Sequence, residues 1–174
     1  MTKTPDPHEQ VQAWFAGRLP DGWFTAPPEV EADRDEIQVV GRLAEPDLPA
    51  DASPEARAAG AEARIHGFRE DTRGQRMAIA EEAQRRFGGK VSWGATCGDR
   101  RQLFTTLSVP AMTRLQMPER QVLDTLVGSG VARSRSHALA WCVRLVAERQ
   151  EDWLADLRDA LTRVQEVRGE GPRD

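Results

Sequence analysis

The sequence is poor in cysteine and has no long apolar run. Its two cysteines, Cys97 and Cys142, form no CxxC pair and fall on different predicted elements, so neither a disulfide framework nor a zinc site is indicated. The longest apolar stretch, residues 138–146, is interrupted by Arg144 and is too short to cross a bilayer. No signal-peptide core follows the polar residues 1–6. We therefore expect a soluble, cytoplasmic protein with no membrane partner and no metal.

The motifs of common enzymes and nucleotide-binding proteins are also missing. The sequence contains neither a P-loop nor a GxGxxG fingerprint. Its three histidines are scattered and assemble no Ser/His/Asp or Cys/His set. The acidic run at residues 33–36 is interpreted as a solvated turn and not as a metal site. The sequence thus predicts a protein that is not an enzyme, with no catalytic residue and no cofactor.

Charge is distributed unevenly along the chain. The net charge is −4, but residues 51–110 carry +2 and residues 111–150 carry +3, between flanks of −6 (residues 1–50) and −3 (residues 151–174). A basic island in an acidic protein is compatible with a compact DNA-contacting module. A charge of this size also arises by chance, so it permits DNA binding without establishing it.

Residues 1–110 are predicted to form a small α+β domain of unknown role. Apolar spacing predicts a helix over residues 8–19, and β-rich runs predict strands over 36–43, 90–97 and 102–109, the last two joined as a hairpin. A long helix is expected from Pro54, after the cap Ser53, to Phe87. Glycines weaken it, so a break is expected at residues 72–74. The stretch 44–59 is too poor in large apolar residues to be packed throughout.

Two sets of apolar side chains in this region are assigned to a core. The long helix places one set near a single stripe: Ala61, Ile65, Phe68, Ile79, Ala83 and Phe87. Trp23, Trp93 and Phe104 form the second set, which could instead be a stacking platform for single-stranded nucleic acid. No basic residues are regularly interleaved with these aromatics, which favours core packing.

From Met112 onward the pattern becomes more specific. Residues 112–117 alternate between two faces, which predicts a short strand. Pro118 occupies the first position of a helix, where its missing N–H costs nothing, and Gly-Ser-Gly at 128–130 closes that helix. Ser134 caps a second helix. Such short elements cannot bury their own apolar faces, so we expect a homodimer in which two strands pair antiparallel and four helices share one core.

This segment resembles the ribbon-helix-helix family of bacterial repressors and antitoxins. The residues that carry the resemblance are Leu-Gln-Met-Pro-Glu-Arg-Gln-Val-Leu-Asp-Thr-Leu-Val at 115–127 and Ser-Arg-Ser-His-Ala-Leu at 134–139. The resemblance implies a two-stranded ribbon in the DNA major groove, with its outer face reading bases: Met112, Arg114 and Gln116. Arginine suits guanine and glutamine suits adenine. It also implies that the start of the second helix contacts the phosphate backbone, through Ser134, Arg135 and Ser136.

Two features depart from the family pattern, and simpler interpretations stay open. Met112 is apolar at the first reading position, and this ribbon follows 110 residues although the family often places it near the N-terminus. Arg114 and Gln116 could be the solvated face of an edge strand, and Ser134 a plain helix cap. A competing register makes residues 102–109 the ribbon, but it leaves Pro118 inside an over-long first helix.

Beyond residue 148 the second helix is expected to continue as a C-terminal extension. An apolar stripe recurs there at heptad-like spacing, formed by Trp153, Leu154, Leu157, Leu161 and Val164. The stripe is interpreted as packing on the protein's own N-terminal domain, as a short coiled coil, or as a docking site for a protein partner.

The sequence as a whole predicts an α+β protein of three parts: a small domain (1–110), a ribbon-helix-helix module (111–150) and a helical extension (151–174). The predicted function is a homodimeric, sequence-specific transcriptional regulator that binds double-stranded DNA. One alternative is an antitoxin-like protein that binds a protein partner through the C-terminal helix. Another is an RNA-associated or scaffold protein that works through the N-terminal sheet.

Overall fold

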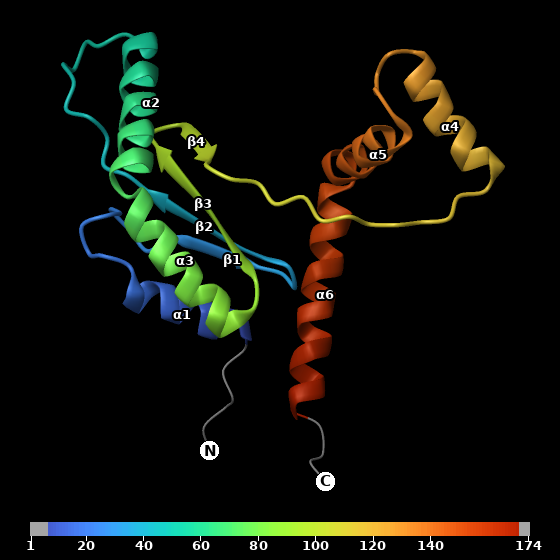
Figure 1. Cartoon of the computed structure of the whole chain (residues 1–174), viewed down its shortest axis with the longest axis horizontal. Helices are drawn as coiled ribbons and strands as arrows, with labels where there is room; N and C mark the ends of the chain where they lie inside the picture. The colour runs from blue at the N-terminus through green and yellow to red at the C-terminus, as the bar shows by residue number, and fades with distance from the viewer. Residues whose placement is uncertain (1–6, 171–174) are drawn as a thin grey trace. The chain divides into compact units, whose positions relative to one another are not determined.

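The computed structural model describes residues 7–170, which fall into two compact units, an N-terminal unit up to Pro110 and a C-terminal unit from Ala111. The elements of the N-terminal unit are α1 (Pro7–Arg18), β1 (Glu29–Ala32), β2 (Glu36–Arg42), α2 (Pro54–Asp71), α3 (Arg73–Phe87), β3 (Lys90–Cys97) and β4 (Arg100–Leu103) (Figure 1). Those of the C-terminal unit are α4 (Met117–Gly128), α5 (Arg135–Arg149) and α6 (Glu151–Glu170). The predicted α+β class is confirmed.

The four strands form one sheet in the order β1-β2-β3-β4. The outer pairs, β1 with β2 and β3 with β4, are antiparallel, whereas the central pair of β2 and β3 is parallel. A parallel pair needs a crossover connection, and α2 with α3 supplies it. The long predicted helix is therefore the link between the two central strands.

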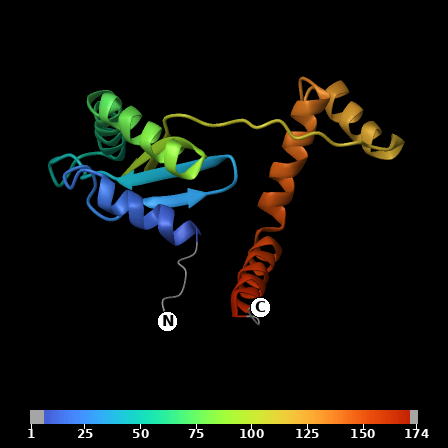
Figure 2. The same cartoon turned by 60° about the horizontal axis from the view of Figure 1, so that its bottom comes forward.

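Side chains from all three helices of the N-terminal unit pack against the same face of the sheet. The helix α1 lies beside β1, and α3 lies beside β3 (Figure 2). Alternate residues of β2 and β3 join one core with side chains from each helix: Ile37, Val39, Trp93, Ala95 and Cys97 from the strands, Phe15 from α1, Ile65 from α2 and Ile79 from α3. Successive strand residues point to opposite faces, so a core built on alternate positions lies on one side. The apolar stripe predicted for the long helix contributes to this core.

The predicted break in the long helix occurs at Thr72, between α2 and α3. The backbone N–H and the hydroxyl of Thr72 both donate to the carbonyl oxygen of Phe68. The same hydroxyl accepts a hydrogen bond from Nε of Arg76 (2.9 Å), and Nη2 of Arg76 donates to the carbonyl of Arg69 (2.6 Å). Arg76 is 7% exposed, so a buried guanidinium holds the two helices at this junction.

The strands differ from the expected ones in two places. The second hairpin strand, expected over 102–109, ends at Leu103, and Phe104 turns into the core with its N–H bonded to the carbonyl of Trp93 (2.7 Å). Gln102 and Leu103 are paired with β3, and the next helix begins at Met117 and not after Pro110. The competing register over residues 102–109 therefore does not fit the structure. The strand β1 was not predicted, since two prolines come directly before it.

An ion pair crosses the face of the sheet opposite the core. Nη1 of Arg101, on β4, donates to Oε2 of Glu29, on β1, at 2.7 Å, although β2 and β3 lie between those strands. Glu29 pairs in register with Val40, which is 3% exposed, and Val40 with Gly94. A Cβ at Gly94 would lie 2.8 Å from Cδ2 of Leu103 and 2.9 Å from the carbonyl oxygen of Gln102. The side chain of Leu103 and the backbone of Gln102, both on β4, therefore lie close to this glycine.

Candidate nucleic-acid interface

A hairpin of two helices forms the base of the C-terminal unit. α4 has Pro118 in its first turn, as predicted, and after its end Gly130 adopts φ 79° and redirects the chain. The N–H of Ala132 then donates to the carbonyl of Leu126 (3.0 Å). Ser134 caps α5 by accepting a hydrogen bond from the N–H of His137 (3.2 Å). These bonds fix the start of α5 beside the end of α4.

The core of this unit is small. In its described part three residues are buried, Leu123, Ala132 and Ala138, with five more packed partly against them: Leu115, Leu126, Val127, Leu139 and Cys142. Four valines of α4, α5 and the turn between them are exposed: Val122, Val131, Val143 and Val146. A single copy of the hairpin therefore leaves much of its apolar surface in contact with water.

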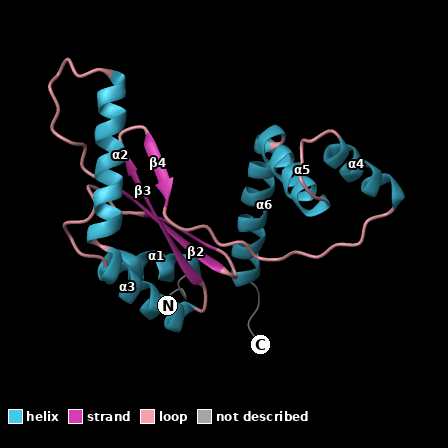
Figure 3. Ribbon diagram, turned by 45° about the horizontal axis from the view of Figure 1, so that its top comes forward, coloured by secondary structure: helices cyan, strands magenta, loops and turns pink. Residues whose placement is uncertain are grey.

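Residues 111–116, which contain the predicted base-reading side chains, are extended and lead directly into α4 (Figure 3). Within the described chain, none of their backbone N–H groups donates a hydrogen bond. Arg120 anchors the end of the segment, since its Nη1 donates to the carbonyl of Leu115 (2.6 Å) and its N–H to that of Gln116 (3.1 Å). The backbone is thus available for pairing with another strand.

The side chains of this segment match the predicted alternation in part. Met112 is fully exposed, and Arg114 and Gln116 are also exposed, whereas Leu115 lies half-buried against the small core. Thr113 and Met117, expected on the same face as Leu115, are exposed too. One copy of the chain therefore covers a single residue of the face that was expected to be buried.

The three predicted phosphate-contacting residues lie together at the start of α5, but Arg135 has a protein partner. Its Nε and Nη2 donate to the two carboxylate oxygens of Asp124 on α4, at 2.6 Å and 2.7 Å. These hydrogen bonds hold the pKa of Asp124 below its ordinary value and raise that of Arg135. Ser134 acts as the helix cap, and Ser136 is exposed.

Sequence reasoning missed Asp124. It precedes Arg135 by eleven positions, across a turn, and no local periodicity relates the two. Within the described chain, no hydrogen bond joins the residues of the extended segment 112–116 to those at the start of α5. Within one copy of the chain, the predicted base-reading residues and the predicted phosphate-contacting residues therefore form two separate groups.

The helix expected to continue beyond residue 148 is interrupted. Gln150 adopts φ −124° and ψ 32°, which ends α5, and α6 starts at the next residue. The apolar stripe of α6 has side chains between 42% and 63% exposed: Trp153, Leu157, Leu161, Val164 and Val167. Leu154 is half-buried. Neither α4 nor α5 covers this stripe.

The described part of the chain also contains neither a candidate metal site nor a candidate membrane-spanning helix. No group of three or more His, Cys, Asp and Glu residues there could hold a metal ion. None of the described helices has both the length and the apolar character needed to cross a membrane.

Comparison with known proteins identifies the family. Residues 9–103 match "Rv1265-like protein, N-terminal domain", and residues 116–168 match "Mb1296 C-terminal domain". Relatives include "Uncharacterized protein Rv1265" of Mycobacterium tuberculosis (strain ATCC 25618 / H37Rv) and "Uncharacterized protein Mb1296" of Mycobacterium bovis (strain ATCC BAA-935 / AF2122/97). Each is 57% identical over 159 residues, which is 91% of this chain and 69% of the relative. The chain belongs to the Rv1265-like family.

The two domains matched in this family meet between residues 103 and 116, an interval that contains the boundary between the two structural units at Pro110. No solved structure matches the chain. The descriptions of the Rv1265-like and Mb1296 domains name no activity, so any functional inference for this member has to come from its own residues.

Proposed function

We propose that this member of the Rv1265-like family is a homodimeric, sequence-specific DNA-binding regulator that acts in the cytoplasm through a ribbon-helix-helix module. The observation that carries the proposal is the extended segment 111–116. It has free backbone N–H groups, exposes Arg114 and Gln116, and is followed at once by a capped two-helix hairpin. In such a module two of these segments pair antiparallel and enter the major groove.

The small core supports a second copy as the partner. Three buried residues are too few to hold a unit of this size, and oligomerisation is the usual remedy. Pairing across a two-fold axis would supply hydrogen bonds for the extended segment and would cover Met117, Val122, Val143 and Val146. The outward face would keep Met112, Arg114 and Gln116 for bases. Ser134 and Ser136 would remain at the start of α5 for phosphate, where helix N–H groups favour an anion.

DNA selection followed by titration tests the proposal. The full chain is first incubated with fragmented genomic DNA, and a bound fragment is recovered. Arg114→Ala and Gln116→Ala should each weaken binding to that fragment by about 1–3 kcal/mol and change binding to random DNA little, because each removes a base contact. Arg149→Ala, which removes an exposed arginine at the far end of α5, is the matched control.

Three results decide the question. Loss of specific binding in the two ribbon variants but not in Arg149→Ala supports base reading by the segment. Equal weakening on all DNA in all three variants would mean charge attraction without reading. Unchanged binding in both ribbon variants would reject the ribbon as the DNA-contacting element.

A second candidate function rests on the uncovered stripe of α6. An amphipathic helix with an exposed apolar face fits a groove on another protein, which is how an antitoxin-like protein would hold its partner. Leu157→Lys and Leu161→Lys would then abolish capture of a partner while leaving DNA affinity and dimer mass unchanged. If the same variants change the mass of the isolated protein instead, α6 associates with other copies of itself.

A further inference from the structure

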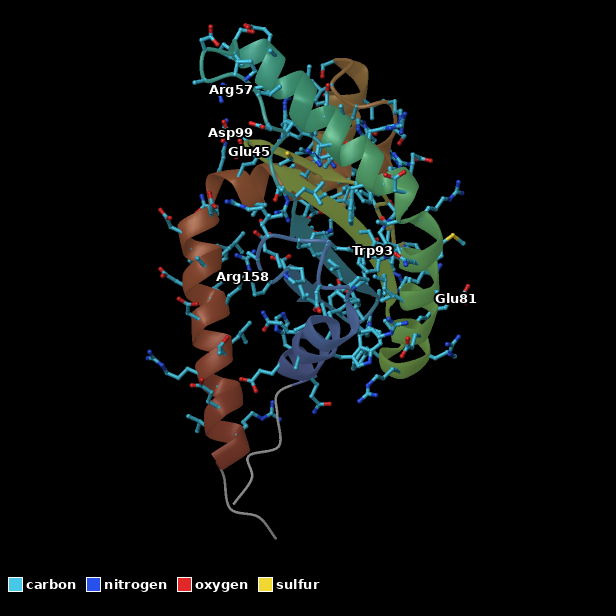
Figure 4. All side chains as sticks on the ribbon, turned by 90° about the vertical axis from the view of Figure 1, so that its left-hand side faces the viewer. Glu45, Arg57, Glu81, Trp93, Asp99 and Arg158 are labelled. Atoms are coloured by element: carbon cyan, nitrogen blue, oxygen red, sulfur yellow. The ribbon has the colours of Figure 1, made fainter. Side chains whose placement is uncertain are left out.

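The N-terminal unit contains a cavity of about 350 Å³ with a cationic side and an apolar side. Arg69, Arg73 and Arg76 from the α2–α3 junction form the cationic side. The apolar side is formed by Met77, Ala80, Val91, Trp93 and Phe104. Trp93 comes from β3, on the face that the helices cover (Figure 4). Small-molecule sites typically measure about 300–1,000 Å³, so the volume is sufficient for a small ligand.

Arg76 is a buried cation without a buried anion. Its Nε and Nη2 bond to the hydroxyl of Thr72 and the carbonyl of Arg69, which are both uncharged. Within the described chain, no carboxylate lies within ion-pair distance of its guanidinium. Burial lowers the pKa of Arg76, and the charge of Arg69 lowers it further. A buried charge is costly unless it is paired, and an anion in the cavity would supply the pair.

The surroundings of Arg76 combine further positive charge with aromatic surface. Arg69 and Arg73 are exposed at the cavity, and the one carboxylate beside them, that of Glu70, lies 3.9 Å from Nε of Arg69. The guanidinium groups of Arg76 and Arg69 lie 4.9 Å and 5.8 Å from the ring centre of Phe104. The cavity lining therefore contains three arginines and one glutamate, which leaves an excess of positive charge.

Trp93 adds an unsatisfied donor to the same region. It is 4% exposed, and its Nε1 has no hydrogen-bond partner within the described chain. Buried indole N–H groups ordinarily find a partner. Trp93, which lines the cavity, therefore has an indole N–H without a hydrogen-bond acceptor in the described chain.

We propose that this cavity binds a small organic anion, with its phosphate or carboxylate on the three arginines and its flat apolar body against Trp93 and Phe104. The apolar wall argues for an organic body in place of a bare inorganic ion. The proposal uses no residue of the C-terminal unit, so it stands or fails separately from DNA binding.

Titration of the full chain with phenyl phosphate tests the site, with inorganic phosphate, benzoate and benzyl alcohol as comparison ligands. Phenyl phosphate or benzoate should bind at least about tenfold more tightly than inorganic phosphate or benzyl alcohol, because the cavity recognises charge and ring together. Binding should shift the indole N–H resonance of Trp93 in the NMR spectrum. This resonance is assigned as the one that disappears in Trp93→Phe. The resonances of Trp141 and Trp153, in the other unit, should stay in place.

Matched variants locate the anion. Arg73→Gln and Arg69→Gln should each weaken binding about five- to tenfold, since each removes a charge-assisted contact. Arg85→Gln removes the same charge from an exposed position of α3 that does not line the cavity, and it should leave the affinity unchanged. The proposal is overturned if neither aromatic anion binds more tightly than inorganic phosphate. It is also overturned if Arg85→Gln weakens binding as much as the cavity variants do.

Discussion

Arg135 donates two hydrogen bonds to Asp124, of 2.6 Å and 2.7 Å, and so joins the first turn of α5 to α4. This relationship changes the expected role of Arg135. A guanidinium that donates two hydrogen bonds to a carboxylate can contact a phosphate only through its remaining N–H groups, or after the ion pair breaks. If the C-terminal unit binds DNA as proposed, Asp124 would compete with the DNA phosphate for Arg135.

Replacement of Asp124 tests this competition. Asp124→Asn should raise affinity for all DNA and steepen the salt dependence by about one phosphate contact per subunit, because it releases Arg135 and removes a nearby negative charge. Titrations at several salt concentrations measure both effects. Glu148→Gln, with the same charge change near the end of α5, should alter the slope less. A loss of affinity in Asp124→Asn would instead make Arg135 a residue that only holds the hairpin together.

Oligomeric state depends on Leu115 in the proposed arrangement. Leu115→Asp would put a charge into the apolar core that two copies share, and a buried unpaired charge is costly. Light scattering of the full chain should give a dimer for the unchanged protein and a monomer for this variant. Met112→Asp, three positions earlier on a fully exposed residue, should stay dimeric. A well-folded dimer of Leu115→Asp would contradict a shared core at this position.

The junction of α2 and α3 should depend on the hydroxyl of Thr72. Thr72→Val keeps the shape but leaves Nε of Arg76 without an acceptor in a buried place, which should lower the free energy of unfolding by about 1–3 kcal/mol. Urea denaturation monitored by tryptophan fluorescence measures the change. Thr72→Ser retains the acceptor and should lose less. A loss in Thr72→Ser as large as that in Thr72→Val would contradict the stabilising role of this hydrogen bond, because serine retains the acceptor.

Two glycines should respond to alanine with opposite signs. Gly94→Ala would press a methyl group against Leu103 and the backbone of Gln102, and overpacking of this kind costs about 1–3 kcal/mol. Gly67 lies within α2 with open space around it, so Gly67→Ala should stabilise the protein by about 0.5–1 kcal/mol. The two unfolding midpoints should therefore move in opposite directions. An unchanged or higher midpoint for Gly94→Ala would contradict the close contact of β4 with Gly94.

Local signals predicted the local structure well. The cap at Ser134, the proline in the first turn of α4 and the break at Thr72 each depend on a few neighbouring residues, and each was found where the sequence placed it. Burial of Trp93 and Phe104 also followed from composition, because no regular basic residues accompany them.

Long-range relationships did not follow from the sequence. Glu29 and Arg101 are 72 positions apart, and only the order of the strands brings them over the same part of the sheet. The buried position of Arg76 was equally hidden, since an arginine on a helix is ordinarily assigned to the surface. The pair of Asp124 and Arg135 spans a turn whose geometry depends on Gly130. In each case the chemistry came from a contact that no sequence period encodes.

The connection between the units, residues 105–110, has a consequence of its own. Six residues span at most about 21 Å even when fully extended. When the C-terminal unit binds a target, the effective concentration of the tethered N-terminal unit near that target is therefore in the millimolar range. An affinity too weak to detect between separate molecules becomes significant within one tethered chain. Even a weak affinity of the N-terminal unit for the same target would therefore lengthen the time for which the whole chain stays bound.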